Sequence, residues 1–206
     1  VNGVGSHGAM PEKGIDPINI AAHIYLSLQS VVAREVAAQD PCVLTIGKFS
    51  GGQAPNIIPE KVVMEGTIRY KERETGTRVF ERIRQFSNLC ARSFGGNAVV
   101  TEIASAPPLI NNEDMLYAFS DAVKQFDGVK PFVILPQGGM GSEDFASFSY
   151  EVPSAYLLLG AGSPQENEAY GKPMHNPAVV FNEDILSLGS AVYAACAIHW
   201  LKNPKF

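Results

Sequence analysis

The sequence predicts a mixed α/β (α+β) protein, in which a two-layer β-α-β-β-α-β domain is followed by part of a second α/β domain. Two long amphipathic helical patterns, at 16–35 and 75–94, lie between segments that alternate apolar and polar residues. The pair Pro107-Pro108 interrupts this pattern. Beyond it, the short continuous apolar runs FVIL and YLLL are typical of strands covered on both faces.

The first helix is predicted at 16–35. Asp16 precedes Pro17, and proline is favoured at the first helical position because its missing N–H would have no partner there. Apolar residues then recur at helical spacing, so one face of the helix is apolar. That face consists of Ile20, Ile24, Ser27 with Leu28, and Val31.

Two strands joined by a turn are predicted next. The segments CVLTIGKF (42–49) and KVVMEGTIRY (61–70) have the residue types and the alternation of strands. The Gly- and Pro-containing segment SGGQAPN (50–56) between them predicts a turn. In the first strand, one face is formed by Val43, Thr45 and Gly47 and the other by Leu44, Ile46 and Lys48.

A second helix and a last strand complete the first domain. The helix at 75–94 ends before Gly95-Gly96-Asn97, because glycine readily adopts the left-handed conformation that closes a helix. AVVTEIA (98–104) predicts the last strand. With a strand that ends at residue 1, the order is β-α-β-β-α-β. The apolar stripe of the second helix is Val79, Ile83, Phe86 and Cys90.

The residues after the proline pair predict only part of a domain, because two strands cannot form a sheet covered on both faces. We therefore divide the chain into 1–106 and 107–206. The chain also opens without an initiator Met, and we expect a piece of a longer protein. The predicted elements are a helix at 113–126, a strand at 131–135, a Gly-rich loop with a short helix at 137–148, a strand at 154–160, a long loop, and a helix at 183–201.

Composition excludes several partners. Sixteen Lys and Arg against 21 Asp and Glu give a net charge of −5 without a basic block, which argues against nucleic acid. No uninterrupted apolar run approaches the ~20 residues of a membrane span, so we expect no membrane. The cysteines, odd in number and far apart in apolar segments, predict free thiols in a reducing, cytoplasmic compartment. They are Cys42, Cys90 and Cys196.

Of the four histidines, two lie in loops where binding groups concentrate. His23 and His199 fall inside predicted helices, where a surface or core-edge imidazole is the simplest interpretation. His7, in GVGSHGAMPEKGIDP, is suited to donate a hydrogen bond near neutral pH, or is a polar loop residue. His175, in YGKPMHNPAVVF, is either a metal ligand or a solvated imidazole.

Two further segments carry groups that suit an anionic substrate. Asn56 in GGQAPNIIP and Arg69 in GTIR present donors in fixed directions that could clamp a carboxylate. The alternatives are a turn-forming Asn and a solvated Arg. In QGGMGSEDFASF, Ser142 is either a helix cap or part of a loop that faces substrate.

The order of five motifs resembles one known family. SHGAMPxxGIDP, GGQAPNIIP, GTIR, GSEDF and MHNP follow one another as in the dinuclear-metal aminoacylase and carboxypeptidase G family of metallopeptidases. The branch of hippurate hydrolases and indole-acetyl-amino-acid amidohydrolases is the most similar. The resemblance covers essentially all 206 residues. It implies that 1–106 are the lid and dimerisation domain and that 107–206 are the C-terminal part of the catalytic domain.

The resemblance also implies a role for each candidate residue. His175 matches a ligand of a site for two divalent ions, which are zinc, manganese or cobalt. His7 matches the residue that stabilises the oxyanion, often from the partner subunit. Asn56 and Arg69 match the residues that bind the substrate's carboxylate. The segment that contains Glu143 matches a part that lines the pocket.

The family's other metal ligands are a Cys-x-His pair, a Glu-Glu pair that includes the general base, and a further His, and all lie before the lid. Neither pair occurs in this chain. We therefore expect a portion of an amidohydrolase that cleaves N-acyl amino acids, inactive by itself, without stably bound metal, and homodimeric through the lid. The alternative is a non-catalytic dimerisation or binding module, either truncated or derived from a pseudo-enzyme.

Overall fold

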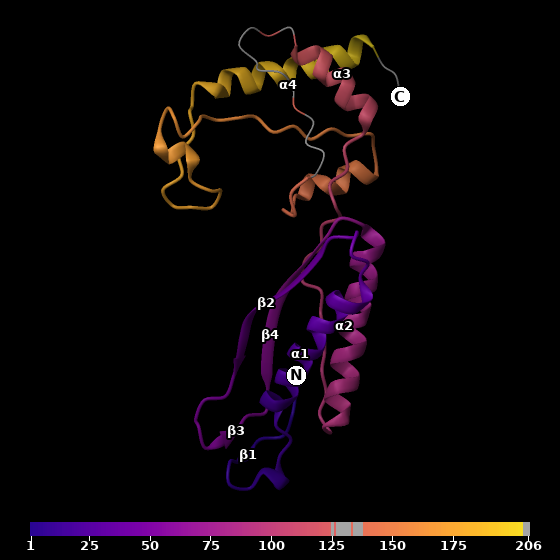
Figure 1. The fold of residues 1–206 in the computed structure, drawn as a ribbon, viewed down its shortest axis with the longest axis vertical. Helices are drawn as coiled ribbons and strands as arrows, with labels where there is room; N and C mark the ends of the chain where they lie inside the picture. The colour runs from indigo at the N-terminus through magenta and orange to yellow at the C-terminus, as the bar shows by residue number, and fades with distance from the viewer. Residues whose placement is uncertain (125, 127–132, 134–137, 204–206) are drawn as a thin grey trace. The chain divides into compact units, whose positions relative to one another are not determined.

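A computed structural model describes residues 1–124, 126, 133 and 138–203 as two compact units (Figure 1). Unit 1 comprises Val1–Pro108 with Gly139–Asp144, and unit 2 comprises Leu109–Gly138 with Phe145–Phe206. Their assignment to a lid domain and to part of a catalytic domain stays a prediction.

Unit 1 has two layers, in which two helices pack on one face of an antiparallel hairpin (Figure 1). The mixed α/β class is as predicted, and both helices form within two residues of their predicted bounds. The elements are β1 (Ser6–His7), η1 (Pro11–Lys13), α1 (Pro17–Glu35), β2 (Cys42–Gly51), β3 (Ile57–Ile58), β4 (Val62–Tyr70) and α2 (Arg73–Ser93).

Local signals fix the ends of both helices. The Asp16 side chain accepts a hydrogen bond from the Ile18 N–H, 2.8 Å away, which caps the start of α1. Gly95 follows α2 with φ of 79°, and its N–H donates to the Arg92 carbonyl, 3.0 Å away. This is the left-handed helix end for which the sequence supplies a glycine.

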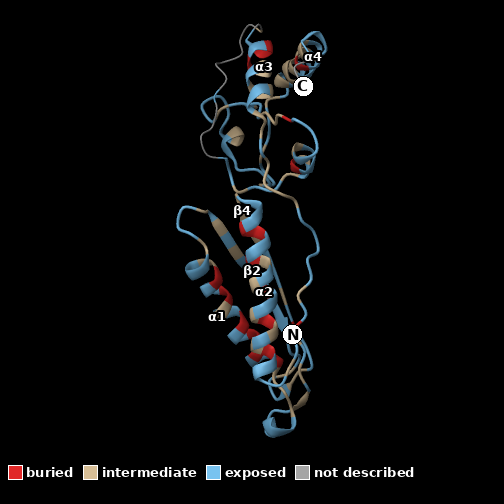
Figure 2. Ribbon diagram, turned by 90° about the vertical axis from the view of Figure 1, so that its right-hand side faces the viewer, coloured by how far each residue is buried: buried red, intermediate tan, exposed pale blue. Residues whose placement is uncertain are grey.

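The core of unit 1 lies between the helices and the hairpin. Figure 2 shows buried residues along both α1 and α2. The predicted apolar face of α1 is among the most deeply buried parts of the chain, with Ile24 and Val31 fully inaccessible. The buried core cluster is Ile20, Ile24, Leu28, Val31, Val79, Ile83, Ala91 and Ala98.

A β-bulge interrupts the hairpin at Gly47. The ladder pairs Ile46 with Gly66 but then Lys48 with Glu65, so Gly47 has no partner. The extra residue shifts the alternation, and Lys48 lies on the face of Glu65 rather than on the face of Ile46. The two side chains form an exposed ion pair, with 2.6 Å between Nζ and Oε1. The strict alternation predicted for this strand is therefore wrong beyond Ile46.

The predicted strand at 98–104 does not form, and the predicted N-terminal strand is reduced to short bridges. Asn2 bridges Lys61 on one side and Asn97 on the other. Ala98 then packs into the core, but residues 98–104 have no ladder partner among the described residues. Because a strand needs a hydrogen-bonded neighbour, the apolar alternation alone gives an extended segment.

Unit 2 contains helices and extended segments in its described part. α3 packs against α4, and two short 3-10 helices lie between them in sequence. The strand predicted at 131–135 lies outside the described residues, apart from position 133. The elements are α3 (Glu113–Val123), η2 (Asp144–Tyr150), η3 (Glu168–Gly171) and α4 (Ile185–Lys202).

The predicted strand at 154–160 is also wrong, and a side chain explains part of the difference. The Asn111 amide donates to the Tyr156 carbonyl at 3.1 Å and accepts from the Tyr156 N–H at 2.6 Å. Both backbone groups of Tyr156 are thus satisfied without a neighbouring strand. The segment has no helix or strand assignment and belongs to no sheet in the described structure.

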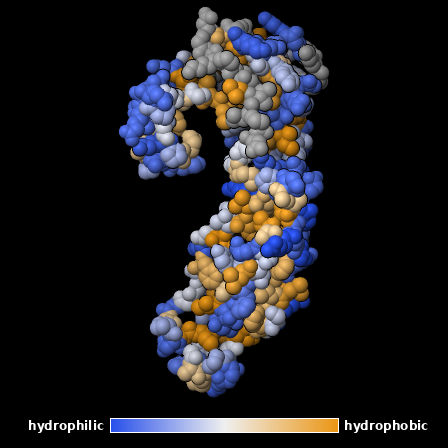
Figure 3. All heavy atoms as spheres, viewed as in Figure 1, coloured by the Kyte–Doolittle hydropathy of each residue, from blue (hydrophilic) through white to orange (hydrophobic). Residues whose placement is uncertain are grey.

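α4 is apolar around most of its surface. Leu186, Tyr193 and Leu201 are each more than 60% exposed. By length and composition alone α4 is apolar enough to cross a membrane, which a search for an uninterrupted apolar run misses because Ser, Gly and His interrupt it. The core helix of a soluble protein passes the same test. Hydrophobic residues reach the visible surface of unit 2 (Figure 3).

A buried polar contact joins α2 to the segment before β2. The Thr75 hydroxyl, in a residue that is 4% exposed, donates to Oδ2 of Asp40. The other carboxylate oxygen, Oδ1, is buried and has no hydrogen-bond partner in the described structure. The Thr75 hydroxyl therefore replaces a hydrogen bond from water that the Asp40 carboxylate loses on burial.

We predict that Thr75→Val lowers the free energy of unfolding by about 1–3 kcal/mol, because it leaves the partly buried Asp40 carboxylate without its donor. The control is Thr77→Val on the exposed face of the same helix, which changes stability by less than about 0.5 kcal/mol. Urea unfolding of the 206-residue chain measures both values. Equal stabilities of the two variants would contradict this role of Thr75.

Candidate functional site

His7 and Asn56 come together because β1 pairs with β3. The antiparallel register places Ser6 opposite Ile58 and His7 opposite Ile57. One residue further on, the Gly8 N–H donates to the Asn56 carbonyl, 2.8 Å away. Two candidate residues separated by 49 positions in the sequence thus lie on adjacent chain segments.

Gly8 permits this approach. A Cβ at position 8 would lie 3.1 Å from the Asn56 carbonyl oxygen and 3.3 Å from its carbonyl carbon. Both are backbone atoms, which cannot move aside without shifting the pairing of β1 with β3. Sequence reasoning did not single out Gly8, although a glycine directly after a candidate histidine was a visible signal for close backbone contact.

The His7 side chain is exposed, and one of its ring nitrogens is held by its own loop. The Ala9 N–H donates to Nδ1 at a distance of 3.1 Å. The Met10 N–H donates to the His7 carbonyl, 2.8 Å away, and closes the turn that follows β1. The ring is therefore held next to a tight turn at the end of a strand.

Arg69 lies at the opposite end of β4 from Asn56. It pairs with Val43, whereas Val62 pairs with Gly51 at the end of the ladder next to the loop that carries Asn56. Arg69 lies seven residues after Val62 along the strand, which corresponds to about 23 Å. In Figure 1, β1 and β3 also lie beyond the Val62 end of the hairpin. Within one chain, the structure does not bring Arg69 to His7 and Asn56.

The Arg69 side chain is half-buried, and its Nη1 donates to the Ile68 carbonyl, 3.1 Å away. In β4, Met64 and Ile68 pack against the helix-side core, so Arg69 projects from the opposite face of the hairpin. A guanidinium on this face can bind an anion without displacing core residues.

His175 has an unusual backbone conformation. Its φ of 66° is the only positive value at a non-glycine residue in the described part of the chain. The Asn176 N–H donates to the Pro173 carbonyl, 3.1 Å away, which closes a turn with His175 at its third position. A left-handed conformation costs a non-glycine residue roughly 1–2 kcal/mol. Such strain is typical of functional positions.

Glu143 is half-buried just before η2, in the segment that the sequence analysis identified as a pocket lining. No described group of three or more His, Cys, Asp or Glu residues could hold a metal ion. His175 therefore has too few potential co-ligands among the described residues for a zinc site, which needs three or four protein ligands. The residues described here do not by themselves fit a metal centre.

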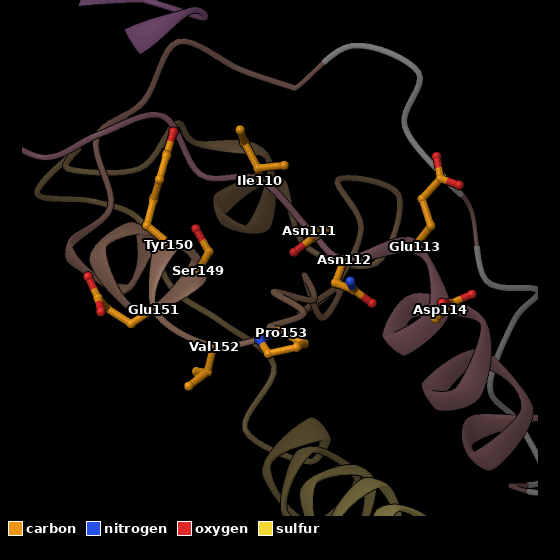
Figure 4. Close-up of a pocket in the computed structure, with 10 residues that line it drawn as sticks. All are labelled: Ile110, Asn111, Asn112, Glu113, Asp114, Ser149, Tyr150, Glu151, Val152 and Pro153. Atoms are coloured by element: carbon orange, nitrogen blue, oxygen red, sulfur yellow. The ribbon is translucent and has the colours of Figure 1, made fainter. Parts of the chain in front are cut away.

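Unit 2 also contains an open pocket of about 580 Å³ between the start of α3 and the end of η2 (Figure 4). Glu113, Asp114 and Glu151 give it an acidic rim. None of the four predicted site residues lines it. This pocket and the predicted site are therefore different places.

The chain matches a family model described as a peptidase dimerisation domain over residues 1–89. It is 38% identical to an uncharacterized hydrolase of Sinorhizobium fredii, over 90% of this chain and 45% of that protein. It is 35% identical to IAA-amino acid hydrolase ILR1-like 2 of Arabidopsis thaliana, over 98% of this chain and 46% of that protein. It is 33% identical to the hippurate hydrolase of Campylobacter jejuni, over 98% of this chain and 51% of that protein. The chain spans about half the length of the curated relatives it matches.

Solved structures share the fold. A candidate aminohydrolase from methicillin-resistant Staphylococcus aureus superposes with a TM-score of 0.79 at 28% identity, over 97% of this chain and 50% of that one. A dinuclear metal-binding peptidase of the M20 family from Bacillus subtilis superposes with a TM-score of 0.71 at 25% identity, over 98% and 49% of the two chains.

We predict that His175→Gly is more stable than His175→Ala by about 1 kcal/mol, because only glycine accepts a positive φ without strain. Both variants lack the imidazole, so their difference isolates the backbone term. Thermal and urea unfolding of the two chains measure it. A His175→Ala chain as stable as His175→Gly would show that the turn is not strained.

Proposed function

We propose that the complete protein, a member of the M20 family of amidohydrolases and peptidases, hydrolyses the amide bond of an N-acyl amino acid, and that residues 1–89, which match the peptidase dimerisation domain, serve as its dimerisation domain. The relatives named as hippurate hydrolase and IAA-amino acid hydrolase support this substrate class. The observation that supports the proposal is the pairing of β1 with β3, which brings the backbone of Asn56 against Gly8, the residue directly after His7.

In this proposal His7 donates a hydrogen bond to the oxyanion that develops at the scissile carbonyl. Such a donor is effective when it is already oriented before the charge forms. Asn56 and Arg69 bind the free carboxylate of the amino acid, for which an amide N–H and a guanidinium fork are suitable donors. His175 serves as one metal ligand of the complete site, together with residues outside this chain.

Divalent metal is part of the proposal, since one of the structural relatives is described as a dinuclear metal-binding peptidase. We propose two ions of zinc, manganese or cobalt in the complete enzyme. Bound ions of this kind supply a Lewis acid and an activated water. His175 is a neutral-imidazole ligand that suits each of these metals.

The separation of Arg69 from His7 and Asn56 favours a site built from two copies of the chain. An N-acyl amino acid is about as long as a dipeptide, or ~7 Å. It cannot reach from the hairpin tip to the far end of β4, a distance of about 23 Å. We therefore propose a homodimer in which His7 and Asn56 of one subunit and Arg69 of the other serve the same substrate.

A cytoplasmic location is also proposed. Cys42, Cys90 and Cys196 are all free. Burial raises the pKa of each thiol, and at Cys42 the nearby Asp40 carboxylate raises it further. Thiols of this kind stay protonated and unreactive at neutral pH, which fits a structural role in a reducing compartment.

The second candidate is a non-catalytic dimerisation or binding module. The absence of a group of potential metal ligands from the described residues favours it for the 206-residue chain taken alone.

We predict that this chain, purified and dialysed against zinc or manganese, retains no stoichiometric metal and does not hydrolyse hippurate or N-acetyl amino acids. A single imidazole does not provide the three or four ligands that a zinc site requires. Elemental analysis and an amidase assay test both statements. One bound metal per chain together with amidase activity would contradict them.

A complementation experiment tests the two-copy site in the complete enzyme. His7→Ala and Arg69→Ala should each abolish most activity towards carboxylate-bearing substrates. Mixed dimers contain one site with both defects and one intact site, so an equimolar mixture should recover about a quarter of the wild-type activity. The matched control mixes His7→Ala with Asn56→Ala. One subunit supplies both of these residues to a site, so every site of the mixed dimer carries a defect and activity should not recover. Recovery in neither mixture would show that Arg69 and His7 come from the same subunit and would contradict the two-copy site.

A further inference from the structure

We propose that the backbone N–H of Ala9 fixes the proton of neutral His7 on Nε2, so that the ring presents a hydrogen-bond donor on the side away from its own loop. This deepens, and rests on, the role proposed above for His7. It assigns a positioning function to Ala9 that depends on its main chain rather than on its side chain.

The contact at Nδ1 of His7 determines which ring nitrogen carries the proton. The Ala9 N–H points at Nδ1 of His7 over 3.1 Å. A backbone N–H can only donate, so Nδ1 must offer a lone pair to form this bond. A neutral imidazole carries one proton, and with Nδ1 as the acceptor that proton lies on Nε2.

Backbone hydrogen bonds on both sides of Ala9 hold its N–H against the His7 ring. The register of β1 against β3 fixes the backbone at His7. The Gly8 N–H is bound to the Asn56 carbonyl, and the Met10 N–H is bound to the His7 carbonyl. With the amides on both sides already committed, the Ala9 N–H is the donor of this turn that faces the ring.

His23 provides an opposite case in the same unit. Its Nδ1 lies 2.9 Å from the carbonyl oxygen of Asn19, one turn earlier in α1. A carbonyl oxygen can only accept, so here Nδ1 carries the proton and Nε2 has the lone pair. The two exposed imidazoles of unit 1 are therefore expected in opposite tautomers.

The tautomer matters for the proposed chemistry. An oxyanion is stabilised by N–H groups that are aimed at it before the reaction. With Nδ1 engaged by Ala9, Nε2 of His7 always presents an N–H. In the tautomer of His23, the same position would present a lone pair and repel the developing negative charge.

Nitrogen NMR of the ¹⁵N-labelled 206-residue chain tests the proposal. The spectra are recorded as a pH series, and the tautomers are determined in the alkaline range where the ring signals no longer change with pH. We expect an unprotonated Nδ1 for His7, with a scalar coupling across the hydrogen bond to the Ala9 amide nitrogen. For His23 we expect a protonated Nδ1. A protonated Nδ1 at His7, or no coupling to Ala9, overturns the proposal.

Two variants separate the main chain from the side chain of Ala9. Ala9→Ser keeps the N–H and should keep the coupling. Ala9→Pro removes the N–H, and the Nδ1-protonated form of His7 should then become detectable. The Gly8 amide, which Asn56 protects from hydrogen exchange, reports whether β1 and β3 remain paired. An unchanged tautomer ratio in a chain whose Gly8 stays protected would overturn the positioning role.

This readout is independent of catalysis. If His7→Ala in the complete enzyme retained full amidase activity, the proposed function of His7 would fail while the tautomer result stood. If the tautomer were wrong and His7→Ala were inactive, the catalytic role would stand and the positioning by Ala9 would fail.

Discussion

The candidate site depends on the backbone pairing between the first eight residues and the segment 56–62. Hydrogen bonds run from Val62 to Val1, from Gly3 to Glu60 and from Gly8 to Asn56, and they hold the N-terminal segment along the hairpin tip. The turn after β1 surrounds the His7 ring, but only the pairing with 56–62 brings the segment that carries Asn56 next to it. Because backbone groups form these bonds, the arrangement tolerates many side chains but favours glycine at position 8, where a Cβ would lie 3.1 Å from the Asn56 carbonyl oxygen.

Helices were predictable from the sequence because their causes are local. Asp16 caps α1, the face that begins at Ile20 is buried, and Gly95 ends α2, each within a few residues of the element it determines. The strands at 98–104 and 154–160 failed because a strand exists only with a partner, and partners are distant in sequence. At Tyr156 the partner is the amide of Asn111, which no periodicity reveals.

For the candidate site residues too, local features were predictable from the sequence and long-range contacts were not. The loops of His7 and His175 were recognisable from their composition and motif order, and the turn that strains His175 follows from Pro173 and Asn176. Spacing alone did not reveal that Asn56 joins His7 while Arg69 lies at the other end of β4. A carboxylate clamp composed of Asn56 and Arg69 is consistent with the chemistry of both residues, but one copy of the chain cannot assemble it.

The bulge at Gly47 has a consequence for how this hairpin can change during evolution. Deleting this one residue would place Lys48 directly after Ile46, and ordinary alternation would keep Lys48 paired with Glu65 on the face away from the helices. The outer end of β2 and the loop that ends in Asn56 would keep their orientation. In a regular part of the ladder, a one-residue deletion would instead move every following side chain to the other face. Homologous hairpins should therefore vary in length by one residue more readily at this bulge than elsewhere in the ladder.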